Sequence, residues 1–430
     1  MGKDVKETPK REERAFDEEE LARERDGLTA TLEALRGDLR AFVIGVGYRV
    51  FLELLEEERG LLCGPRYAHS EERQAYRHGY DTGSLVFGGR KISVPKPRVR
   101  SFGGRELELE TWREASATDP LEERMVEQIL SGVTMRKYGR SLEAAPAEVK
   151  TSTESRSSVS RMFVARTKEQ VKAFLSRPLG DLDISVVLVD GTRLGGHVLL
   201  VALGIDADGH KHVLGVVEGT TESSQVCLSL FRNLLDRGLV VERPRLFVVD
   251  GGRGIRSAIR TTFGMWALVH RCHVHKLKNI LDHLPEHKRP WVRQIVRRAL
   301  SEKDATKAKQ HLLRLAKQLD ELHPGAASSV REGLDEMLTL HRLGIQGPLY
   351  QSLKSTNSIE NLQGSIKTLA RHVKRWRSGS MAVRWCVTAL SEAERHFRRI
   401  KGYRDIPFLM AALDTALEQN HQIINESEVA

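Results

Sequence analysis

Three carboxylates occupy sequence contexts that suit metal-ion chemistry. Asp190 ends the apolar run SVVLVD, Asp250 ends the apolar run RLFVVD, and Glu360 lies in the polar segment KSTNSIENLQ. They are spaced 60 and then 110 residues apart, so a shared site would have to be assembled by folding. Carboxylates on rigid elements supply the hard oxygen ligands that a pair of Mg²⁺ ions needs, with positions left open for phosphate oxygens. The pattern predicts a two-metal phosphoryl-transfer centre.

Each carboxylate also has a purely structural explanation. An Asp-Gly pair after a hydrophobic strand is often only a turn, because both residues favour tight reversals. Glutamate is a good helix former that normally faces water. The prediction therefore depends on the elements around Asp190, Asp250 and Glu360 and on whether those elements bring the three together.

The segments around the two aspartates predict an α/β fold with a mixed sheet. SVVLVDGT, HVLLVALGID and HKHVLGVVEG predict three consecutive strands joined by short turns. An amphipathic helix ending at Gly238, the strand RLFVVD, the helix GIRSAIRTTF and the strand WALVHRC follow. This β-β-β-α-β-α-β order, over about residues 180–275, is typical of a ribonuclease H-like core. With the first strand central and the fourth parallel beside it, Asp190 and Asp250 are expected to be neighbours.

The sequence beyond this core predicts mostly helices. Continuous helical patterning over 276–350 predicts an all-α insertion, which explains the long gap before Glu360. STNSIENLQGSIKTLARHVKRW then predicts a helix with Glu360 in its first turn, opening a C-terminal region at 351–420. Residues 421–430 are expected to be a tail.

Positive charge is concentrated on either side of Glu360. The net charge is +10, and residues 361–405 hold eleven Lys and Arg against three Asp and Glu, while residues 276–325 hold twelve against six. Two such segments predict a polyanionic partner, most simply double-stranded DNA, although a solvated helix face would explain either one alone. Trp376 and Trp385 could stack on a base or pack the terminal helices. The DNA-binding candidates in this region are Lys367, Arg371, Lys374, Arg375 and Trp376.

The N-terminal part predicts a separate nucleic-acid-binding region. Residues 1–28 are charge-rich and nearly free of large apolar side chains, which predicts a disordered tail. Residues 29–165 predict a helix at 29–58, a small β-meander including KISVPKPRVR and RELELETW, and a candidate helix-turn-helix in LEERMVEQILSGVTMRKYGRSL. The segment SRSSVSRMFVA then opens with residues that could face a DNA groove: Arg156, Ser157, Ser158, Ser160 and Arg161.

Composition limits the cellular context. No apolar run approaches the roughly 20 residues that span a bilayer, and the N-terminus has no secretory signal pattern. The four cysteines lie far apart in the chain, which suits a reducing compartment better than a disulfide framework. We expect a cytoplasmic protein with no membrane partner, its 430 residues folding as two or three domains.

The segment HRCHVH raises the possibility of a zinc site. It contains His270, Cys272, His273 and His275, but a tetrahedral zinc site normally needs four ligands, and no second ligand pair lies at a recognisable spacing. The alternative, which we favour, is a cysteine and histidines satisfied by local hydrogen bonds.

Several motifs in the same order make the chain resemble the Mutator-type family of bacterial insertion-sequence transposases, from about residue 45 to about residue 415. The matching stretches are VDGT, ALGIDADGHKHVLGVVEGTTES, LLDRGL, VVDGGRGIRSAI, RCHVHKLKNIL, STNSIEN and HFRRIKGYRDIPFL. The resemblance implies a DDE transposase in which Asp190, Asp250 and Glu360 hold two divalent ions, Mg²⁺ or Mn²⁺. It implies a structural or DNA-orienting role for the Cys-x-x-His signature at Cys272 and His275.

The expected function is therefore DNA transposition. The protein would bind the terminal inverted repeats of its element, cleave them, and join the 3′-hydroxyl ends to target DNA, working as a dimer or larger assembly. Two alternatives remain at the level of sequence. One is a nuclease or resolvase on the same fold that does not join strands, and the other is a catalytically silent DNA-binding repressor.

Overall fold

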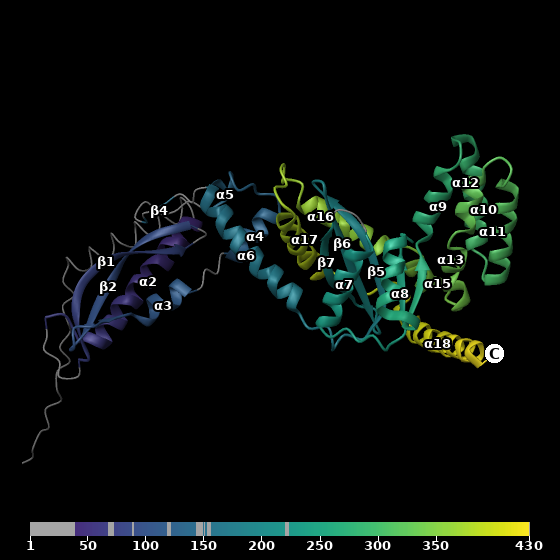
Figure 1. Cartoon of the computed structure of the whole chain (residues 1–430). Helices are drawn as coiled ribbons and strands as arrows, with labels where there is room; N and C mark the ends of the chain where they lie inside the picture. The colour runs from purple at the N-terminus through teal and green to yellow at the C-terminus, as the bar shows by residue number, and fades with distance from the viewer. Residues whose placement is uncertain are drawn as a thin grey trace, which may run out of the picture. The chain divides into compact units, whose positions relative to one another are not determined.

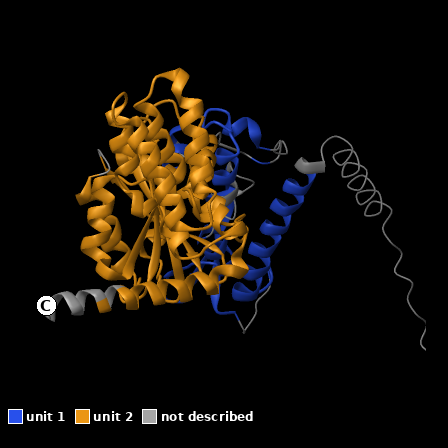
Figure 2. Cartoon of the chain, turned by 90° about the vertical axis from the view of Figure 1, so that its right-hand side faces the viewer, with its two compact units in different colours: residues 1–163 blue, residues 164–430 orange. Residues whose placement is uncertain are grey.

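The computed structural model describes residues 39–67, 73–87, 90–117, 122–142, 149, 151–152, 156–219 and 223–429 (Figure 1). The chain divides into two compact units, residues 1–163 and 164–430, which Figure 2 colours separately. The predicted tail at 1–28 lies outside the described residues.

The first unit is built on a four-stranded antiparallel sheet. The long strands β1 (Ala75–Phe87) and β2 (Arg90–Ser101) form a hairpin, and the two-residue strands β3 (Glu106–Leu107) and β4 (Thr151–Ser152) both pair with β2. The helix α2 (Leu39–Cys63) packs on this sheet and contributes the fully buried Leu55 to its core. Both the helix and the small sheet were predicted from the sequence.

The strand predicted over RELELETW is much shorter than expected. β3 ends at Leu107, and the helix α3 (Glu110–Ala117) begins three residues later. The Glu58 carboxylate accepts hydrogen bonds from the backbone N–H groups of Glu110 (2.5 Å) and Thr111 (3.0 Å). A helix start leaves such N–H groups without partners, so this contact from a distant residue stabilises the helix over the strand.

Three helices follow in the chain. α4 (Glu122–Leu130) leads through Gly132, at φ 110°, to α5 (Tyr138–Ser141), which has only four residues. The second helix of the candidate helix-turn-helix is thus a single turn. α6 (Arg156–Ser176) begins where the segment SRSSVSRMFVA predicted a helix.

The second unit contains the mixed sheet that the sequence predicted. Its strand order is β7-β6-β5-β8-β9, with the first strand of the unit, β5, at the centre. β5, β6 and β7 are antiparallel neighbours, whereas β8 and β9 run parallel to β5. The strands are β5 (Ile184–Leu194), β6 (His197–Asp206), β7 (Lys211–Gly219), β8 (Arg245–Val249) and β9 (Ala267–Arg271).

Helices cover both faces of this sheet. Odd-numbered residues of β5 and β8, such as Val187 and Phe247, join the core formed with α7 (Ser224–Asp236) and α8 (Arg253–Phe263). Even-numbered residues, such as Leu188 and Val248, join the opposite core. Because successive strand residues point to opposite faces, this alternation fixes where the side chain at each strand end points. The helices of the opposite core include α16 (Asn357–Leu369), α17 (Gly379–Glu394) and α18 (Ile406–Val429).

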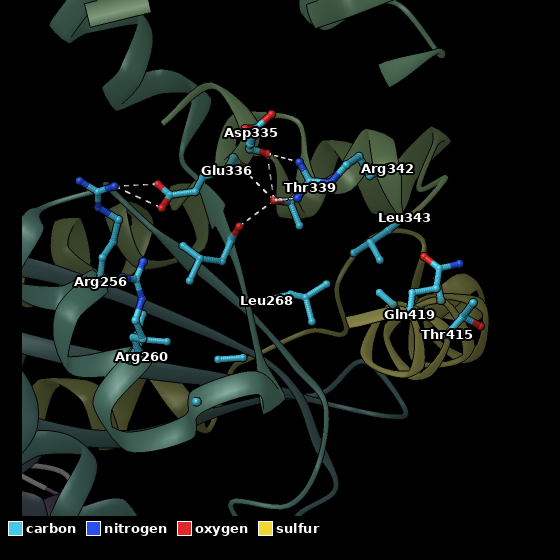
Figure 3. A pocket seen from close by; sticks show the side chains of 16 residues that line it. Arg256, Arg260, Leu268, Asp335, Glu336, Thr339, Arg342, Leu343, Thr415 and Gln419 are labelled. Atoms are coloured by element: carbon cyan, nitrogen blue, oxygen red, sulfur yellow. Dashed lines mark hydrogen bonds and ion pairs between the residues drawn. The ribbon is translucent and has the colours of Figure 1, made fainter. Parts of the chain in front are cut away.

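The chain between β9 and α16 is helical and has its own hydrophobic core, centred on residues such as Leu312 and Val330. A cavity of about 550 Å³ lies between its helices α13 and α14, the edge strand β9 and α18 (Figure 3). The helices are α9 (His273–Asp282), α10 (Arg289–Leu300), α11 (Ala305–Leu319), α12 (Pro324–Arg331), α13 (Leu334–Met337), α14 (Thr339–Arg342) and α15 (Gly347–Leu353).

All four cysteines, Cys63, Cys227, Cys272 and Cys386, are buried and form no disulfide. No helix within the described part of the chain combines the length and the apolar character needed to cross a membrane.

Candidate metal centre

The register of the sheet brings Asp190 next to Asp250. Val189 of β5 pairs in parallel with Val249 of β8, so the next residue of each strand arrives at the same place on neighbouring strands about 4.8 Å apart. Both aspartates have even numbers, and the even-numbered residues of these strands face α16. The register therefore brings the chain positions of Asp190 and Asp250 side by side on neighbouring segments.

Backbone and side-chain amides hold both aspartates. The Asp190 carboxylate accepts hydrogen bonds from Gly191 N (2.9 Å) and from Gln363 Nε2 (3.2 Å), and Gln363 also donates to Gly191 O (3.0 Å). The Asp250 carboxylate accepts one from Gly252 N (3.0 Å). Such contacts orient a carboxylate without neutralising it, which suits a metal ligand.

Glu360 completes the group from the first turn of α16, as the sequence predicted. Its backbone N–H donates to Thr356 O (3.0 Å), the start of the helical ladder. One ligand atom each from Asp190, Glu360 and His275 lie within 4.8 Å of one another. This donor set of two carboxylates and one imidazole fits a divalent cation such as Mn²⁺, which prefers oxygen ligands and also accepts imidazole, and the two carboxylates suit Mg²⁺. Asp250 directly follows β8, the strand that is paired with β5.

His275 belongs to the centre, which sequence reasoning did not foresee. Its Nε2 lies 3.7 Å from Glu360 Oε1. The neighbouring Cys272 side chain, together with the negative charges of Asp190 and Asp250, raises the pKa of His275 to about 9 against the opposing effect of burial. An imidazolium at this place offsets the repulsion among the three carboxylates. The Cys-x-x-His spacing was the available signal, but it did not indicate which residue His275 would meet.

Cys272 connects β8 to the start of α16. Its backbone N–H donates to Val249 O (2.7 Å), and its buried Sγ accepts hydrogen bonds from the backbone N (3.4 Å) and Oγ1 (3.6 Å) of Thr356. Burial acts to raise the pKa of this thiol, but the polar groups of His275 and Thr356 outweigh it and the pKa is lowered. Cys272 thereby fixes the approach of the Glu360 helix to the Asp250 strand.

The zinc alternative for HRCHVH finds no support. Cys272 is engaged by Thr356, and His273 Nε2 lies 2.8 Å from Met337 O. His270 is fully buried, and burial holds its pKa well below the usual range. Among the residues that the structure describes, Asp190, His275 and Glu360 are the group of three or more side chains close enough to share a metal.

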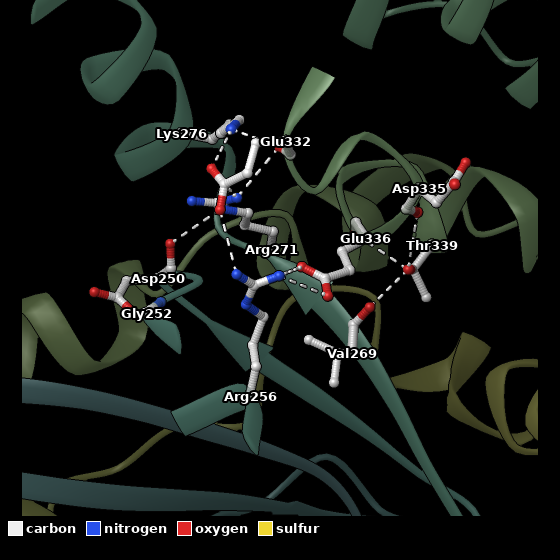
Figure 4. A network of polar contacts seen from close by, with 10 residues as sticks. All are labelled: Asp250, Gly252, Arg256, Val269, Arg271, Lys276, Glu332, Asp335, Glu336 and Thr339. Atoms are coloured by element: carbon white, nitrogen blue, oxygen red, sulfur yellow. Dashed lines mark hydrogen bonds and ion pairs between the residues drawn. The ribbon is translucent and has the colours of Figure 1, made fainter. Parts of the chain in front are cut away.

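A network of charged side chains joins the Asp250 turn to the helical insertion (Figure 4). Arg271, only 4% exposed, donates from Nε to Asp250 O (3.4 Å) and places Nη1 2.9 Å from Glu332 Oε2. The buried Lys276 Nζ lies 3.2 Å from the same carboxylate, and Arg256 contacts both Glu332 and Glu336 at 3.2 Å. Sequence reasoning missed this network, because Glu332 lies 61 residues after Arg271 and nothing local marks the pair.

Arg271 lies directly against the turn that follows Asp250. Gly251 has φ +94°, a conformation that favours glycine, and a Cβ there would come within 2.1 Å of Arg271 Nε. Burial and the nearby Arg271 cation lower the pKa of Lys276 to about 8, with Glu332 opposing. The insertion thus supplies the anion that keeps two buried cations in place beside the metal centre.

The predicted DNA-binding residues of the C-terminal region are solvent-accessible, but the helix that carries them is shorter than expected. α16 ends at Leu369, so only Lys367 lies on it. The indole of Trp376 covers Gly195 in the β5–β6 turn, where a Cβ would come within 1.7 Å of Trp376 Cδ1. Trp385 is buried in the core, as its packing alternative predicted. The exposed cations are Lys367, Arg371, Lys374 and Arg375.

The DNA-binding candidates at the start of α6 lie in the first unit, residues 1–163. Arg156, Ser157 and Arg161 are exposed, and Ser160 is half-buried. The side chain of Ser158 lies outside the described residues.

Comparison with known proteins identifies the family of the chain. The family model described as "Transposase, Mutator family" matches residues 36–399. The chain is 28% identical over 390 residues to the transposase for insertion sequence element ISRM5 of Rhizobium meliloti, covering 89% of this chain and 94% of that protein. It is 27% identical over 337 residues to the transposase for insertion sequence element IS256 in transposon Tn4001 of Staphylococcus aureus, covering 74% and 81%. It is 26% identical over 393 residues to the transposase for insertion sequence element IS1081 of Mycobacterium tuberculosis, covering 87% and 88%. The protein therefore belongs to the Mutator family of transposases.

Proposed function

We propose that this transposase cuts and joins DNA at a two-metal DDE centre formed by Asp190, Asp250 and Glu360. The observation that carries the proposal is the convergence of Asp190 and Glu360, whose ligand atoms lie within 4.8 Å of each other although the residues are far apart in the sequence. The pairing of Val189 with Val249, the residues that precede Asp190 and Asp250, supports including Asp250 in the centre. The structural alternatives, a turn at each aspartate and a water-facing glutamate on a helix, do not explain this convergence.

The core around the centre is proposed to be ribonuclease H-like. Supporting this are three antiparallel strands followed by two strands parallel to the first, with helices on both faces. The helical segment between β9 and α16 then interrupts that core before its last carboxylate.

The residues of the chain would divide the work at the centre. Mg²⁺ or Mn²⁺, bound as a pair, would activate the attacking oxygen and stabilise the departing one in a phosphodiester exchange. Gln363 and Gly191 hold Asp190 in the orientation needed for a ligand, and Cys272 and Thr356 hold the helix that presents Glu360. His275, protonated near neutral pH, keeps Glu360 close to Asp190 when no cation is present.

The DNA partner is proposed to be the terminal inverted repeats of an insertion sequence, followed by target DNA. The N-terminal unit, with Arg156, Ser158 and Arg161, would supply sequence recognition. The exposed cations after Glu360, with Trp376, would hold the backbone, giving an affinity that falls steeply with salt. Since two ends are cut and joined together, the active form would be a dimer or larger assembly on DNA, working in the cytoplasm.

Strand joining tests this function most specifically. Purified protein is incubated with pre-cut element ends, a supercoiled target plasmid and Mg²⁺ or Mn²⁺, and joined products are mapped by sequencing. We expect covalent joining of 3′-hydroxyl ends to the target. Cleavage without joining would indicate a nuclease, and binding without either reaction would indicate a silent DNA-binding protein.

A further inference from the structure

A basic site, separate from the metal centre, lies at the opposite end of the sheet from the carboxylates. The β6–β7 turn, residues 206–211, meets the loop after α17, where Ile400 N donates to Gly209 O (3.0 Å). Gly209 packs against Tyr403 so closely that a Cβ there would come within 2.3 Å of the Tyr403 Cβ. These segments belong to the family-like motifs ALGIDADGHKH and HFRRIKGYRD, and no step at the metal centre uses them.

The two segments enclose a cavity of about 440 Å³ with a surplus of positive charge. Its one carboxylate, Glu394, is bound by Arg177 through Nη1 (3.0 Å) and Nη2 (3.2 Å) and also accepts from Val213 N (2.7 Å). The pair neutralises itself, which leaves the other cations of the lining without compensation in the cavity. These cations are Lys211 and Arg398, since the remaining arginine, Arg395, pairs with Glu392 (3.2 Å).

Lys211 is the most informative of them. Its ammonium lies 4.8 Å above the ring of Phe397, and the described residues offer it no carboxylate or hydrogen-bond acceptor. It is half-buried, and burial lowers its pKa. A partly desolvated cation without an anion is unfavourable, and a bound anion would remove that cost.

The acid of the β6–β7 turn, Asp206, already has hydrogen-bond partners of its own. The Asp206 carboxylate lies 2.8 Å from His212 Nε2 and accepts from the backbone N–H of Asp208 (3.0 Å) and His210 (2.8 Å). Arg398 is exposed and has no hydrogen-bond or ion-pair partner in the described part of the chain. The cavity therefore presents at least two cations that an external anion could pair with.

We propose that this cavity binds the phosphodiester backbone of DNA away from the reacting phosphate, an inference that rests on the proposed DNA substrate. Asp206 pairs with Ile184 at one end of β5, and Asp190 lies six residues further along the strand. At about 3.3 Å per residue the two sites are about 20 Å apart. With a rise of about 3.4 Å per base pair, a duplex that spanned this distance would place about six base pairs between the two contacts. The site would hold DNA that flanks the reaction.

The test is the salt dependence of binding to a long DNA duplex, measured without divalent ions so that no cleavage occurs. Each phosphate contact contributes about 0.9 to the slope of log K against log salt concentration. We expect Arg398→Ala to reduce the slope by about 1, and Lys211→Met with Arg398→Ala to reduce it by about 2. Lys211→Arg should keep the wild-type slope. The matched control is Arg232→Ala, an exposed arginine of α7 with no described partner.

Folding of each variant is monitored by thermal melting. Lys211→Arg shows whether a reduced salt slope is caused by the lost charge or by altered packing. Wild-type slopes in Arg398→Ala and in the double variant would overturn the proposal. A parallel titration with inorganic phosphate separates the two sources of phosphate. Phosphate binding that is lost in Lys211→Met, with an unchanged DNA slope, would assign the cavity to a free anion and overturn the DNA contact. Since the assay needs no catalysis, its result is independent of whether the wild type cuts and joins DNA.

Discussion

At the scale of single residues, the metal centre depends on how each carboxylate is held. Asp190 is oriented by Gln363, which bridges it to Gly191 O, and Glu360 is approached by the charged His275. Neither Gln363 nor His275 is among the three expected ligands, yet both contact them. Two predictions follow from these contacts.

The first concerns Gln363. Replacing it with alanine removes the amide that orients Asp190, and loss of such an outer-shell partner typically costs 10–100-fold in metal affinity or activity. We expect Gln363→Ala to lower Mn²⁺ affinity and the DNA cleavage rate by about that factor, with DNA binding unchanged. Ser365→Ala, an exposed residue of the same helix, is the control. Equal Mn²⁺ titrations for Gln363→Ala and wild type would show that Asp190 does not need this contact.

The second concerns the pH dependence of stability. The pKa of His275 is raised from 6.5 to about 9 in the folded, metal-free protein. Its stabilising contribution is therefore complete below about pH 6.5 and is lost as the pH rises to about 9. We expect the melting-temperature difference between wild type and His275→Gln, measured in EDTA, to shrink over this range. A difference that is constant from pH 6 to about pH 9 would contradict the raised pKa.

At the scale of elements, ion pairs connect the helical insertion to the end of the sheet that carries Asp250. Glu332, just after α12, is the shared anion for Arg271, Lys276 and Arg256, and Arg271 lies against the turn that follows Asp250. We therefore expect a displacement of the insertion to shift the position of Asp250.

This connection predicts the effect of Glu332→Gln. The change leaves buried cations without full compensation, which costs about 1–3 kcal/mol of unfolding free energy, and loosens Arg271 beside Asp250. We expect lower stability in urea and slower metal-dependent cleavage at unchanged DNA affinity. Glu321→Gln, exposed on the same insertion, should affect neither. If Glu332→Gln unfolds more easily but cleaves at the wild-type rate, the network stabilises the insertion without positioning Asp250.

At the scale of the whole molecule, much of the second unit could be predicted from its sequence. Apolar runs ending in Asp190 and Asp250 defined the central strands, because β5 and β8 are buried on both faces and bounded by clear turns. The family-like motifs placed Glu360 on a following helix. The sheet order that makes the aspartates neighbours was likewise predictable from the succession of elements.

What could not be predicted depends on contacts between residues far apart in sequence. Glu58 caps α3 and shortens the ELELE strand, Trp376 packs on Gly195 while α16 stops at Leu369, and Glu332 reaches back to Arg271. Each is a tertiary interaction that either overrides a local sequence pattern or is marked by no local pattern at all. The same holds for His275, whose motif was visible although its approach to Glu360 was not.

The most direct test of the central claim is metal-dependent cleavage of a supercoiled plasmid carrying both ends of the element. Wild type is compared with Asp190→Ala, Asp250→Ala and Glu360→Ala at equal DNA occupancy, in Mg²⁺ and in Mn²⁺. The account predicts cleavage at the ends by wild type and its loss in each of the three variants. Cleavage that survives any one substitution, or a wild type that binds the ends and never cuts them, would contradict it.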